Sequence, residues 1–559
     1  MDIQSLTAEL SVAPQIVAAD LRAIAEAGFR SVICNRPDGE GADQPVFSEI
    51  ERAAEDQGLQ ARYLPAESGK VTDEQGLAFG ALMSELPKPV LAYCRSGMRS
   101  ATMWALWQAG LIPQDPPLPR IIERAAKAGH DLEGVVRRIA NAGKTPVEVA
   151  DATHEVVIIG GGAAGIAVAA SLLARSPDLD IAIIEPADIH DYQPGWTMVG
   201  AGIFDAASTA RTMASLLPRG VHWIKSAVAA FEPERDAVIL DACRVVKYRQ
   251  LVVCPGLKLD WHGIEGQPET LGRNGVTSNY RFDLAPHTWR LVQQFHRGKA
   301  IFTQPPMPIK CAGAPQKAMY LSADHWRRSG VLQAVDIEFC SAGAVLFGVA
   351  DDVPALMEYV ASYGIGLSFG QILVAVDGPP KTATFSKSGT DGKTAFLTRE
   401  FDMLHVVPPQ KAPDFVRVSP LADAAGWVDV NPGTLRHKTF ANVFALGDAG
   451  NTPNAKTATA ARKQAPVVAH NLLVTRGAAL AEASYDGYGS CPLTVERGKI
   501  VLAEFLYGGK LAPSFPKWLI DGTRPSTLAW SLKDRILPPL YREAMLKGRE
   551  WMARPERVG

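Results

Sequence analysis

A glycine-rich turn near residue 160 constrains the fold of this chain more than any other feature of its sequence. Residues 156–159 are a short apolar run, Gly160-x-Gly162-x-x-Gly165 follows directly, and an alanine-rich stretch continues to about Arg175. A strand that enters such a turn and leaves it as a helix presents backbone N–H groups to a pyrophosphate at the helix N-terminus. The pattern therefore predicts a Rossmann-type dinucleotide-binding unit.

A second apolar strand supports this interpretation. Residues 181–184 end in Glu185, twenty residues after Gly165. A carboxylate at that place accepts hydrogen bonds from a ribose 2′-hydroxyl. The alternatives are a glycine-rich turn without a ligand and, for the uncharged run 156–174, a transmembrane helix. The strand, the helix and the terminal acid together favour the nucleotide site over both.

Features far downstream indicate which dinucleotide is bound. An apolar strand over 441–446 ends in Gly447-Asp448, which suits a contact to the ribityl chain of a flavin. A helix that begins near Lys456 and Thr457 directs its positive N-terminus at the flavin ring. We therefore expect FAD at this site.

The region near residue 300 argues against a second, nicotinamide site. A separate NAD(P)H domain should carry its own glycine fingerprint there, but the sequence has prolines at 305 and 306. Cys311 stands nearby, beside Lys310 and ahead of Pro315, which suits the first turn of a helix. A cationic neighbour and a helix N-terminus both lower the pKa of a thiol. A reactive thiolate and a buried packing cysteine are equal alternatives for Cys311.

Composition excludes several classes of protein. With 57 Lys and Arg against 59 Asp and Glu, the net charge is −2, which argues against binding nucleic acid. Seven cysteines without a CxxC pair or a Cys/His cluster at zinc spacing predict neither a metal site nor a disulfide framework. The first residues lack the apolar run of a secretory signal. We expect a protein of a reducing, cytoplasmic compartment.

The residues from about 153 to 545 resemble the sulfide:quinone oxidoreductases, most closely their mitochondrial-type branch. The resemblance is carried by the glycine fingerprint and by residues 190–202, 310–315, 419–423, 456–458 and 485–493. It implies a flavoprotein with two dinucleotide-type domains that binds FAD, with Trp196 among the cofactor-binding residues. It further implies that sulfide is oxidised to the persulfide level at a cysteine, with a small thiol as sulfur acceptor. Electrons then pass through the flavin to a quinone, and a homo-oligomer is expected.

The sequence departs from that family at one redox cysteine. Cys311 matches the first of the two family cysteines, but the position after Gly447-Asp448 is Ala449. The resemblance therefore predicts a persulfide on Cys311, near the reactive face of the flavin, with Ala449 opposite it. Cys254 and Cys340 are alternative partners, although each is more often a buried structural cysteine. Cys243 and Cys491 have no reactive context in the sequence.

The N-terminal region has a reactive-cysteine loop of its own. A strand over 89–93 leads into Cys94-Arg95-x-Gly97-x-Arg99, and a helical pattern follows. Such a loop cradles an anion with backbone N–H groups. It resembles the small phosphatase-like domains that are fused to enzymes of sulfur metabolism. Tyrosine phosphatases place arginine six positions after the cysteine, whereas here Ser100 stands there and the spacing to Arg99 follows the rhodanese pattern.

We therefore favour a sulfurtransferase role for Cys94, Arg95 and Arg99 over phosphate-ester hydrolysis, with an inert domain as the remaining alternative.

The C-terminal tail carries Trp518 and Trp530 among basic residues. It suits a helix lying in a membrane surface, or else a helix packed on its own domain. A location at the inner face of the membrane follows from the first interpretation.

The sequence as a whole predicts an α/β protein. A small phosphatase-like or rhodanese-like domain precedes a Rossmann-type flavoprotein that has two dinucleotide-type domains and ends in amphipathic helices. The activity expected is FAD-dependent sulfide oxidation with a quinone as electron acceptor; the alternative is a persulfide carrier or sensor with a structural FAD. The expected divisions are residues 1–113, a helical linker 114–153, the flavin module 154–510 and the tail 511–559.

Overall fold

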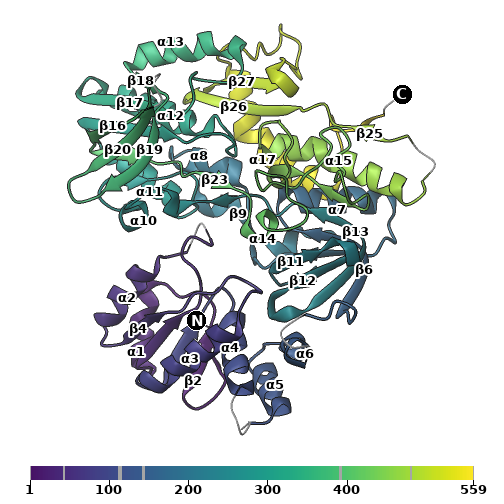
Figure 1. Cartoon of the computed structure of the whole chain (residues 1–559). Coiled ribbons are helices and arrows are strands. Elements are labelled where there is room, and N and C mark those ends of the chain that lie inside the picture. Colours follow the sequence, from purple (N-terminus) through teal and green to yellow (C-terminus); the bar gives the residue numbers. More distant parts are fainter. Residues whose placement is uncertain are drawn as a thin grey trace.

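Runs of Val, Ile and Ala recur in three blocks of the chain, and each block builds its own sheet (Figure 1). The computed structural model describes residues 2–41, 44–110, 116–140, 145–389, 393–478 and 481–557. The α/β fold class expected from the sequence is confirmed. The expected domain boundary at residue 113 lies outside the described residues.

The N-terminal sheet has the strand order β1-β2-β5-β3-β4 and is parallel except for β1. Successive residues point to opposite faces, so Ile33 packs toward one layer of helices and Val32 toward the other. The strands are β1 (Gln4–Ser5), β2 (Leu10–Ala13), β3 (Ser31–Cys34), β4 (Gln60–Tyr63) and β5 (Val90–Tyr93). The helices on the two faces are α1 (Leu21–Glu26) and α2 (Phe47–Glu55), then α3 (Asp73–Glu85) and α4 (Met98–Ala109).

The helices after this domain belong to its core. Ile121 of α5 (Leu118–Lys127) and Val135 of α6 (Glu133–Ala140) are fully buried against Trp104 of α4. The segment expected to be a helical linker is therefore helical over α5 and α6, which pack as an extension of the N-terminal domain, whereas its last residues begin β6 of the flavin sheet.

The second sheet holds the glycine fingerprint. Its strands run in the order β10-β7-β6-β13-β12-β11, and β24 pairs with β13. The strands are β6 (Ala152–Ile159), β7 (Ile181–Ile184), β10 (Val221–Ile224), β11 (Val228–Glu232), β12 (Ala237–Leu240), β13 (Val245–Val253) and β24 (Val443–Ala445). The neighbours β10, β7, β6, β13 and β24 are mutually parallel.

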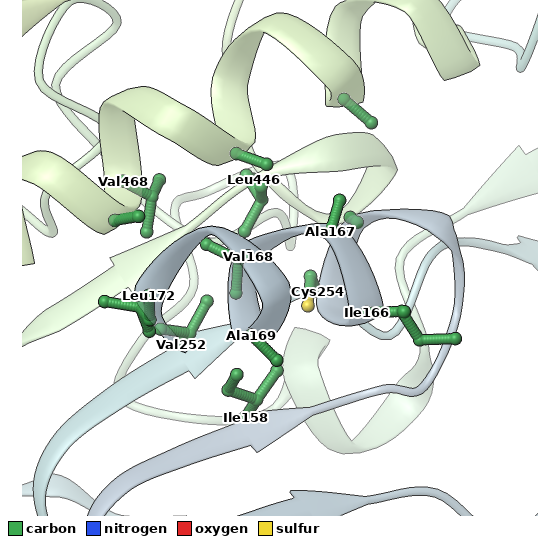
Figure 2. Packing of buried hydrophobic residues seen from close by; sticks show 14 of the residues in the cluster. Ile158, Ile166, Ala167, Val168, Ala169, Leu172, Val252, Cys254, Leu446 and Val468 are labelled. Carbon is green, nitrogen blue, oxygen red and sulfur yellow. The ribbon is translucent and has the colours of Figure 1, made fainter. Parts of the chain in front are cut away.

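Two helices far apart in sequence cover one face of this sheet. Helix α7 (Ala163–Arg175) lies directly on β6 and β13, and α15 (Ala458–Thr475) packs across it (Figure 2). Ala167 and Val168 face α15 while Ile158 and Val252 rise from the strands beneath. Small residues on α7 allow this close packing, which holds the N-terminus of α7 fixed over the end of β6.

The third sheet is parallel, with the order β15-β22-β16-β17-β18. Its strands are β15 (Val276–Thr277), β16 (Gly298–Gln304), β17 (Val335–Ser341), β18 (Gly366–Phe369) and β22 (Met403–His405). It is accompanied by an antiparallel sheet of β19 (Ile372–Asp377), β20 (Thr382–Ser388) and β21 (Thr394–Glu400), and by helices α11 (Leu284–Gln294), α12 (Ala314–Arg328) and α13 (Val353–Tyr363).

The C-terminal part begins with a hairpin of β26 (Gly489–Glu496) and β27 (Lys499–Phe505), which packs on α12. It continues through α16 (Thr527–Ser531), a π-helix (Leu532–Ile536) and α17 (Leu537–Glu543). Short elements complete the two larger bodies: β8 (Ile189–Asp191), α8 (Trp196–Val199), β9 (Ala210–Thr212), α9 (Met213–Leu216), β14 (Lys258–Leu259), α10 (Gln267–Thr270), β23 (Gln410–Lys411), α14 (Asp414–Arg417), β25 (Ala483–Ser484) and β28 (Glu556–Arg557).

The N-terminal domain contacts both larger bodies. The Ser68 hydroxyl donates a hydrogen bond to the carboxylate of Asp241, which belongs to the turn between β12 and β13. Arg273, in the turn after α10, lies 3.4 Å from the Glu49 carboxylate of α2. The N-terminal domain thus forms polar contacts with both larger bodies, and Ala242 of the flavin-binding body joins its apolar core.

Candidate functional site

The turn after β6 is built for close approach of a ligand. Gly160 has a φ of 101°, in the left-handed region that favours glycine. A Cβ on Gly165 would lie 1.9 Å from the carbonyl oxygen of Gly160, so only glycine fits between the turn and α7. A Cβ on Gly162 would meet nothing within 4 Å, so this position opens into free space.

A cavity of about 450 Å³ starts at this turn and extends to α12 and α17. Its lining includes every cofactor-binding residue expected from the sequence except Gly165, which supports the turn from behind. Those lining residues are Gly160, Gly162, Glu185, Trp196, Gly447, Asp448, Lys456 and Thr457. The structure therefore brings together residues that are spread over about 300 positions of the chain.

The carboxylate of Glu185 is fixed at the nucleotide end. Its two oxygens accept hydrogen bonds from the backbone N–H groups of Gly161, at 2.9 Å, and Ala187, at 2.7 Å. This places a negative charge beside the fingerprint turn, where a ribose hydroxyl would donate to it.

The far end of the cavity carries a buried cation. Lys456 Nζ donates to the carbonyl oxygens of Asp448, at 2.6 Å, and Gly450, at 3.0 Å, and lies 4.0 Å from the Trp427 ring centre. Burial lowers the pKa of Lys456 to about 8. Thr457 caps α15 by accepting from the N–H of Ala460 at 3.1 Å. The helix N-terminus and this lysine together favour an electron-rich ligand atom.

Several polar atoms along the cavity wall lack a protein partner. They are Trp196 Nε1, Thr197 Oγ1 and both side-chain polar atoms of Asn279, all buried. A buried polar group without a hydrogen bond costs about 1–3 kcal/mol, so these atoms indicate a polar ligand that completes them. The glycine turn, the Glu185 carboxylate, the N-termini of α7 and α15 and these unpaired polar atoms all fit FAD.

Cys311 lines this cavity, and a second cysteine, Cys491, lies directly beside it, behind the lining. Cys311 Sγ lies 3.7 Å from Cys491 Sγ. Cys311 has a φ of 50° and its N–H donates to the carbonyl of Lys456 at 2.8 Å, which ties it to the start of α15. Cys491 lies on β26 and is held over α12, where a Cβ on Gly313 would come within 2.5 Å of its sulfur.

Two lysines surround the cysteine pair. Lys317 Nζ donates to Cys311 Sγ at 3.1 Å, and Lys533, from the π-helix, lies close enough to interact with both sulfurs. The hydrogen bond from Cys491 and the charge of Lys317 hold the pKa of Cys311 well below its usual range. The pKa of Cys491 is raised by the same hydrogen bond and by burial. Burial and the neighbouring Lys317 lower the pKa of Lys533 to about 7.

The structure corrects the sequence-based choice of a cysteine partner. Ala449 does not face Cys311: it is fully buried in the core behind the sheet, with Val253 and Trp427, and the cavity lining does not include it. The partner is Cys491, which the sequence analysis left without a role although its segment was part of the family resemblance. The two cysteines are 180 residues apart, so only the packing of β26 on α12 brings them together.

The two cysteines named as alternative partners are structural. The side chain of Cys254 packs under α7 (Figure 2), and its sulfur lies 3.8 Å from the Gly160 carbonyl oxygen. Cys340 lies in a separate core, where Arg399 donates to its sulfur at 3.4 Å. Burial raises the pKa of Cys340 to about 12, which disfavours a thiolate there.

Replacing Lys317 with methionine should raise the pKa of Cys311, because the lysine stabilises the charged thiolate. At pH 7 the thiolate fraction, and with it the rate of alkylation by iodoacetamide, should fall at least about tenfold. The measurement is the alkylation rate of Cys311 against pH, read by mass spectrometry. Lys317→Arg keeps the charge and serves as the control. An alkylation profile that Lys317→Met leaves in place would show that the lysine does not hold the thiolate.

The C-terminal segment forms part of the cavity. Lys533, Leu537 and Tyr541 line it. The Tyr541 hydroxyl lies 2.7 Å from His190 Nε2, and Arg175 of α7 pairs with Glu550 at 2.5 Å. The tail expected to contact a membrane is thus also a wall of the active site.

Other side chains of the same segment face outward. Trp518 is 84% exposed, and Leu519, Leu528 and Ile536 are exposed as well, next to the exposed Arg535. Among the residues that the structure describes, no helix has the length and apolar character needed to cross a membrane.

Cys94 lies at the carboxyl end of β5, in the loop that leads into α4. Its side chain is buried and that of Arg95 is exposed. Gly97 caps α4 with a φ of 86°. The structure therefore places Cys94 in the strand–loop–helix setting expected from the sequence, ahead of a helix N-terminus.

Arg99 is already engaged inside the protein. Its guanidinium donates to both carboxylate oxygens of Glu40, at 2.9 and 2.8 Å, and to the carbonyl of Ala66 at 2.7 Å. Arg36 donates to the same carboxylate at 2.7 Å. An anion bound beside Cys94 would therefore depend on backbone N–H groups and Arg95 more than on Arg99.

Fold and site are those of an oxidoreductase with two dinucleotide-type domains and two cysteines in contact beside its cavity. The chain is 38% identical over 456 residues to the mitochondrial sulfide:quinone oxidoreductase of Dictyostelium discoideum, covering 81% of this chain and 96% of that protein. It is 37% identical over 395 residues to the mouse protein, covering 71% and 87%. The chain belongs to the sulfide:quinone oxidoreductase family, and the resemblance found in the sequence is confirmed.

Two further comparisons concern the fold and the N-terminal domain. The X-ray structure of the sulfide:quinone oxidoreductase from Aquifex aeolicus matches with a TM-score of 0.59 at 20% identity, over 71% of this chain and 92% of that one. At this identity the match speaks for the fold alone. Residues 2–111 match the family described as the phosphatase-like domain of Beta-lactamase hydrolase-like protein.

Proposed function

We propose that this protein oxidises sulfide to a persulfide, with FAD in the cavity and a quinone as the electron acceptor. The observation that carries the proposal is that Cys311 lines a cavity that begins at a dinucleotide fingerprint and has Cys491 only 3.7 Å away. The glycine turn and Glu185 would hold the adenosine and pyrophosphate part, while Asp448, Lys456 and Thr457 would hold the flavin part. Bound FAD supplies a two-electron acceptor.

The unequal pKa values of the two thiols set the direction of the sulfur chemistry. When the pair is oxidised to a disulfide, hydrosulfide attacks one sulfur and expels the other as a thiolate. The thiol of lower pKa leaves faster, so attack falls on Cys491 and Cys311 departs as the thiolate beside Lys317. The S–S bond breaks, a new one forms, and Cys491 carries the persulfide. The sequence-based expectation had placed it on Cys311.

The cycle closes with a small thiol. Its thiolate attacks the outer sulfur of the Cys491 persulfide, leaves as a new persulfide and frees the Cys491 thiolate. The two cysteine thiolates then re-form their disulfide by giving up two electrons, which pass to the quinone. Lys317 and Lys533 stabilise the thiolates through these steps, and the burial of Lys533 lets it hold or release a proton near neutral pH.

Anaerobic addition of sulfide together with a small thiol, which accepts the sulfur, tests this function. An enzyme bleaches its flavin absorbance, and a quinone then restores it. The alternative, a persulfide carrier or sensor with a structural FAD, keeps the flavin oxidised. The distinction requires only the purified full-length protein and a spectrophotometer.

We further propose that the protein is cytoplasmic and binds peripherally to the inner face of a membrane. The exposed Trp518, Leu519, Leu528 and Ile536 belong to the same C-terminal segment that supplies part of the cavity wall. Aromatic and aliphatic side chains with basic neighbours suit the lipid–water boundary, and a quinone is dissolved in the lipid. A homo-oligomer remains part of this proposal, on the sequence resemblance alone.

For the N-terminal domain we propose sulfur transfer at Cys94. The engagement of Arg99 by Glu40 supports this role, because a phosphatase needs a free guanidinium to bind two phosphoryl oxygens. In the transfer, the Cys94 thiolate takes the outer sulfur of thiosulfate and releases sulfite; cyanide then removes that sulfur as thiocyanate.

We expect the full-length protein to catalyse thiosulfate:cyanide sulfurtransfer faster than the hydrolysis of p-nitrophenyl phosphate. Cys94→Ser should abolish the sulfurtransfer, because a hydroxyl cannot carry a persulfide, and should leave flavin reduction by sulfide intact. Efficient, Cys94-dependent hydrolysis of the aryl phosphate would establish the phosphatase alternative. Loss of flavin reduction in Cys94→Ser would show that both domains share one catalytic cycle.

A further inference from the structure

Three side chains that could bind a metal ion lie at the end of the flavin-binding sheet that is opposite the glycine fingerprint. The parallel strands β10, β7 and β6 are neighbours, and Ile181 of β7 pairs with Val156 of β6 and Val221 of β10. His154 and Asp180 precede those paired residues, and His222 follows them by one position. The three side chains therefore gather at the amino end of the strands, whereas Gly160 and Glu185 follow the carboxyl ends.

The distances within this cluster suit one metal ion. His154 Nδ1 lies 2.9 Å from Asp180 Oδ1, and His222 Nε2 lies 3.6 Å from the same oxygen. One ligand atom from each residue lies within 4.8 Å of both others. Zinc bonds of about 2.0–2.1 Å in tetrahedral geometry require ligand atoms roughly 3.3 Å apart. The two measured distances lie on either side of that value.

We propose that His154, Asp180 and His222 form a zinc-binding site with three protein ligands and a fourth position open to solvent. Two imidazoles and one carboxylate are a ligand set that zinc prefers. The His154 side chain is 12% exposed and that of His222 is 65% exposed, so the site has a rigid inner side and an open entry. The ion would replace the direct contact between His154 and Asp180.

The surroundings hold the inner ligands in place. The backbone N–H of Asp180 donates to the Glu155 carboxylate at 3.4 Å, and Arg476 pairs with Glu155 at 2.5 Å. Because the ligands stand on three hydrogen-bonded strands, a bound ion links β6, β7 and β10 and stabilises this edge of the sheet. The catalytic cavity lies at the other end of the strands, so the site is structural and separate from sulfide oxidation.

The sequence analysis predicted no metal because it searched for ligands at short spacing. Here the spacings are 26 and 42 residues, which no zinc motif contains. Only the pairing of the three strands brings the ligands together.

Zinc binding to the full-length protein tests the proposal. Cys311 and Cys491 are first replaced with serine, since their thiolates could bind zinc themselves. Equilibrium dialysis should then show one zinc ion per chain, and X-ray absorption at the zinc edge should show nitrogen and oxygen ligands only. His222→Ala in this background should weaken binding at least about a hundredfold, since even the loss of an outer partner costs 10–100-fold.

A matched control uses His296→Ala, which removes an exposed histidine outside the cluster and should leave zinc binding unchanged. Zinc should also raise the melting temperature of the protein and of the His296→Ala variant, and should fail to do so for His222→Ala. The proposal is overturned if His222→Ala binds zinc as tightly as its parent. Sulfur ligands in the absorption spectrum, or no bound zinc in the parent, would overturn it equally.

Discussion

Replacing Cys491 with serine should abolish the reduction of flavin by sulfide, with a loss of at least about a thousandfold in rate. The reason is that serine can neither form the disulfide with Cys311 nor carry a persulfide, so a covalent step is removed entirely. The measurement is stopped-flow absorbance of the flavin after anaerobic mixing with sulfide and a small thiol. The same loss is expected for Cys311→Ser, because the two sulfurs act as one unit.

The matched control is Cys340→Ser. This cysteine is as buried as Cys491 but lies in a separate core, and a hydroxyl can still accept the hydrogen bond from Arg399. Its flavin should be reduced at the wild-type rate. Near-normal reduction in Cys491→Ser would mean that Cys311 works alone and that the sulfur–sulfur contact is incidental.

Two glycine substitutions should separate the structural and ligand-binding roles of the fingerprint turn. A Cβ at Gly162 meets no protein atom within 4 Å, so Gly162→Ala should fold with unchanged stability when the flavin is absent. Its methyl group points into the space where the pyrophosphate would lie, and overpacking there should cost FAD binding about 1–3 kcal/mol. That corresponds to a roughly 5–150-fold weaker affinity.

Gly165→Ala should behave differently. Its Cβ would lie 1.9 Å from the Gly160 carbonyl oxygen, which is backbone and cannot move aside. This variant should lose both the flavin and the stability of the flavin-free protein. The measurements are FAD content by absorbance, FAD affinity by fluorescence titration, and thermal unfolding of the flavin-free forms. Unchanged FAD affinity in Gly162→Ala would show that the pyrophosphate lies elsewhere.

Local sequence patterns were enough to place the cofactor site. The run 181–184 forms β7 with those same bounds, and the apolar run 156–159 ends β6. Both runs are fully buried, so the apolar character that stabilises them also makes them recognisable in the sequence. The conformational needs of Gly160 and Gly165 are likewise local, which is why the turn could be recognised from spacing alone.

The cysteine partner could not be found in this way. The family resemblance places it after Gly447-Asp448, where this sequence has Ala449, so Cys254 and Cys340 were considered instead. In the structure Asp448 lines the cavity while the neighbouring Ala449 packs into the core on the opposite side. In a short turn, the direction of each side chain depends on tertiary packing. A local sequence pattern does not contain that information.

The sequence by itself determined the strand–turn–helix that holds a dinucleotide, the cationic setting of Cys311 and the cysteine loop at Cys94, because each is fixed by residues within a few positions of one another. Only the tertiary structure decided that Cys491 lies beside Cys311, that Lys533 of the tail lies near both, and that two histidines and an aspartate meet at the amino end of the strands. These contacts join segments 26 to more than 200 residues apart. These contacts arise from the packing of helices and strands. That packing depends on strand pairing and burial throughout the chain and not on any one local segment.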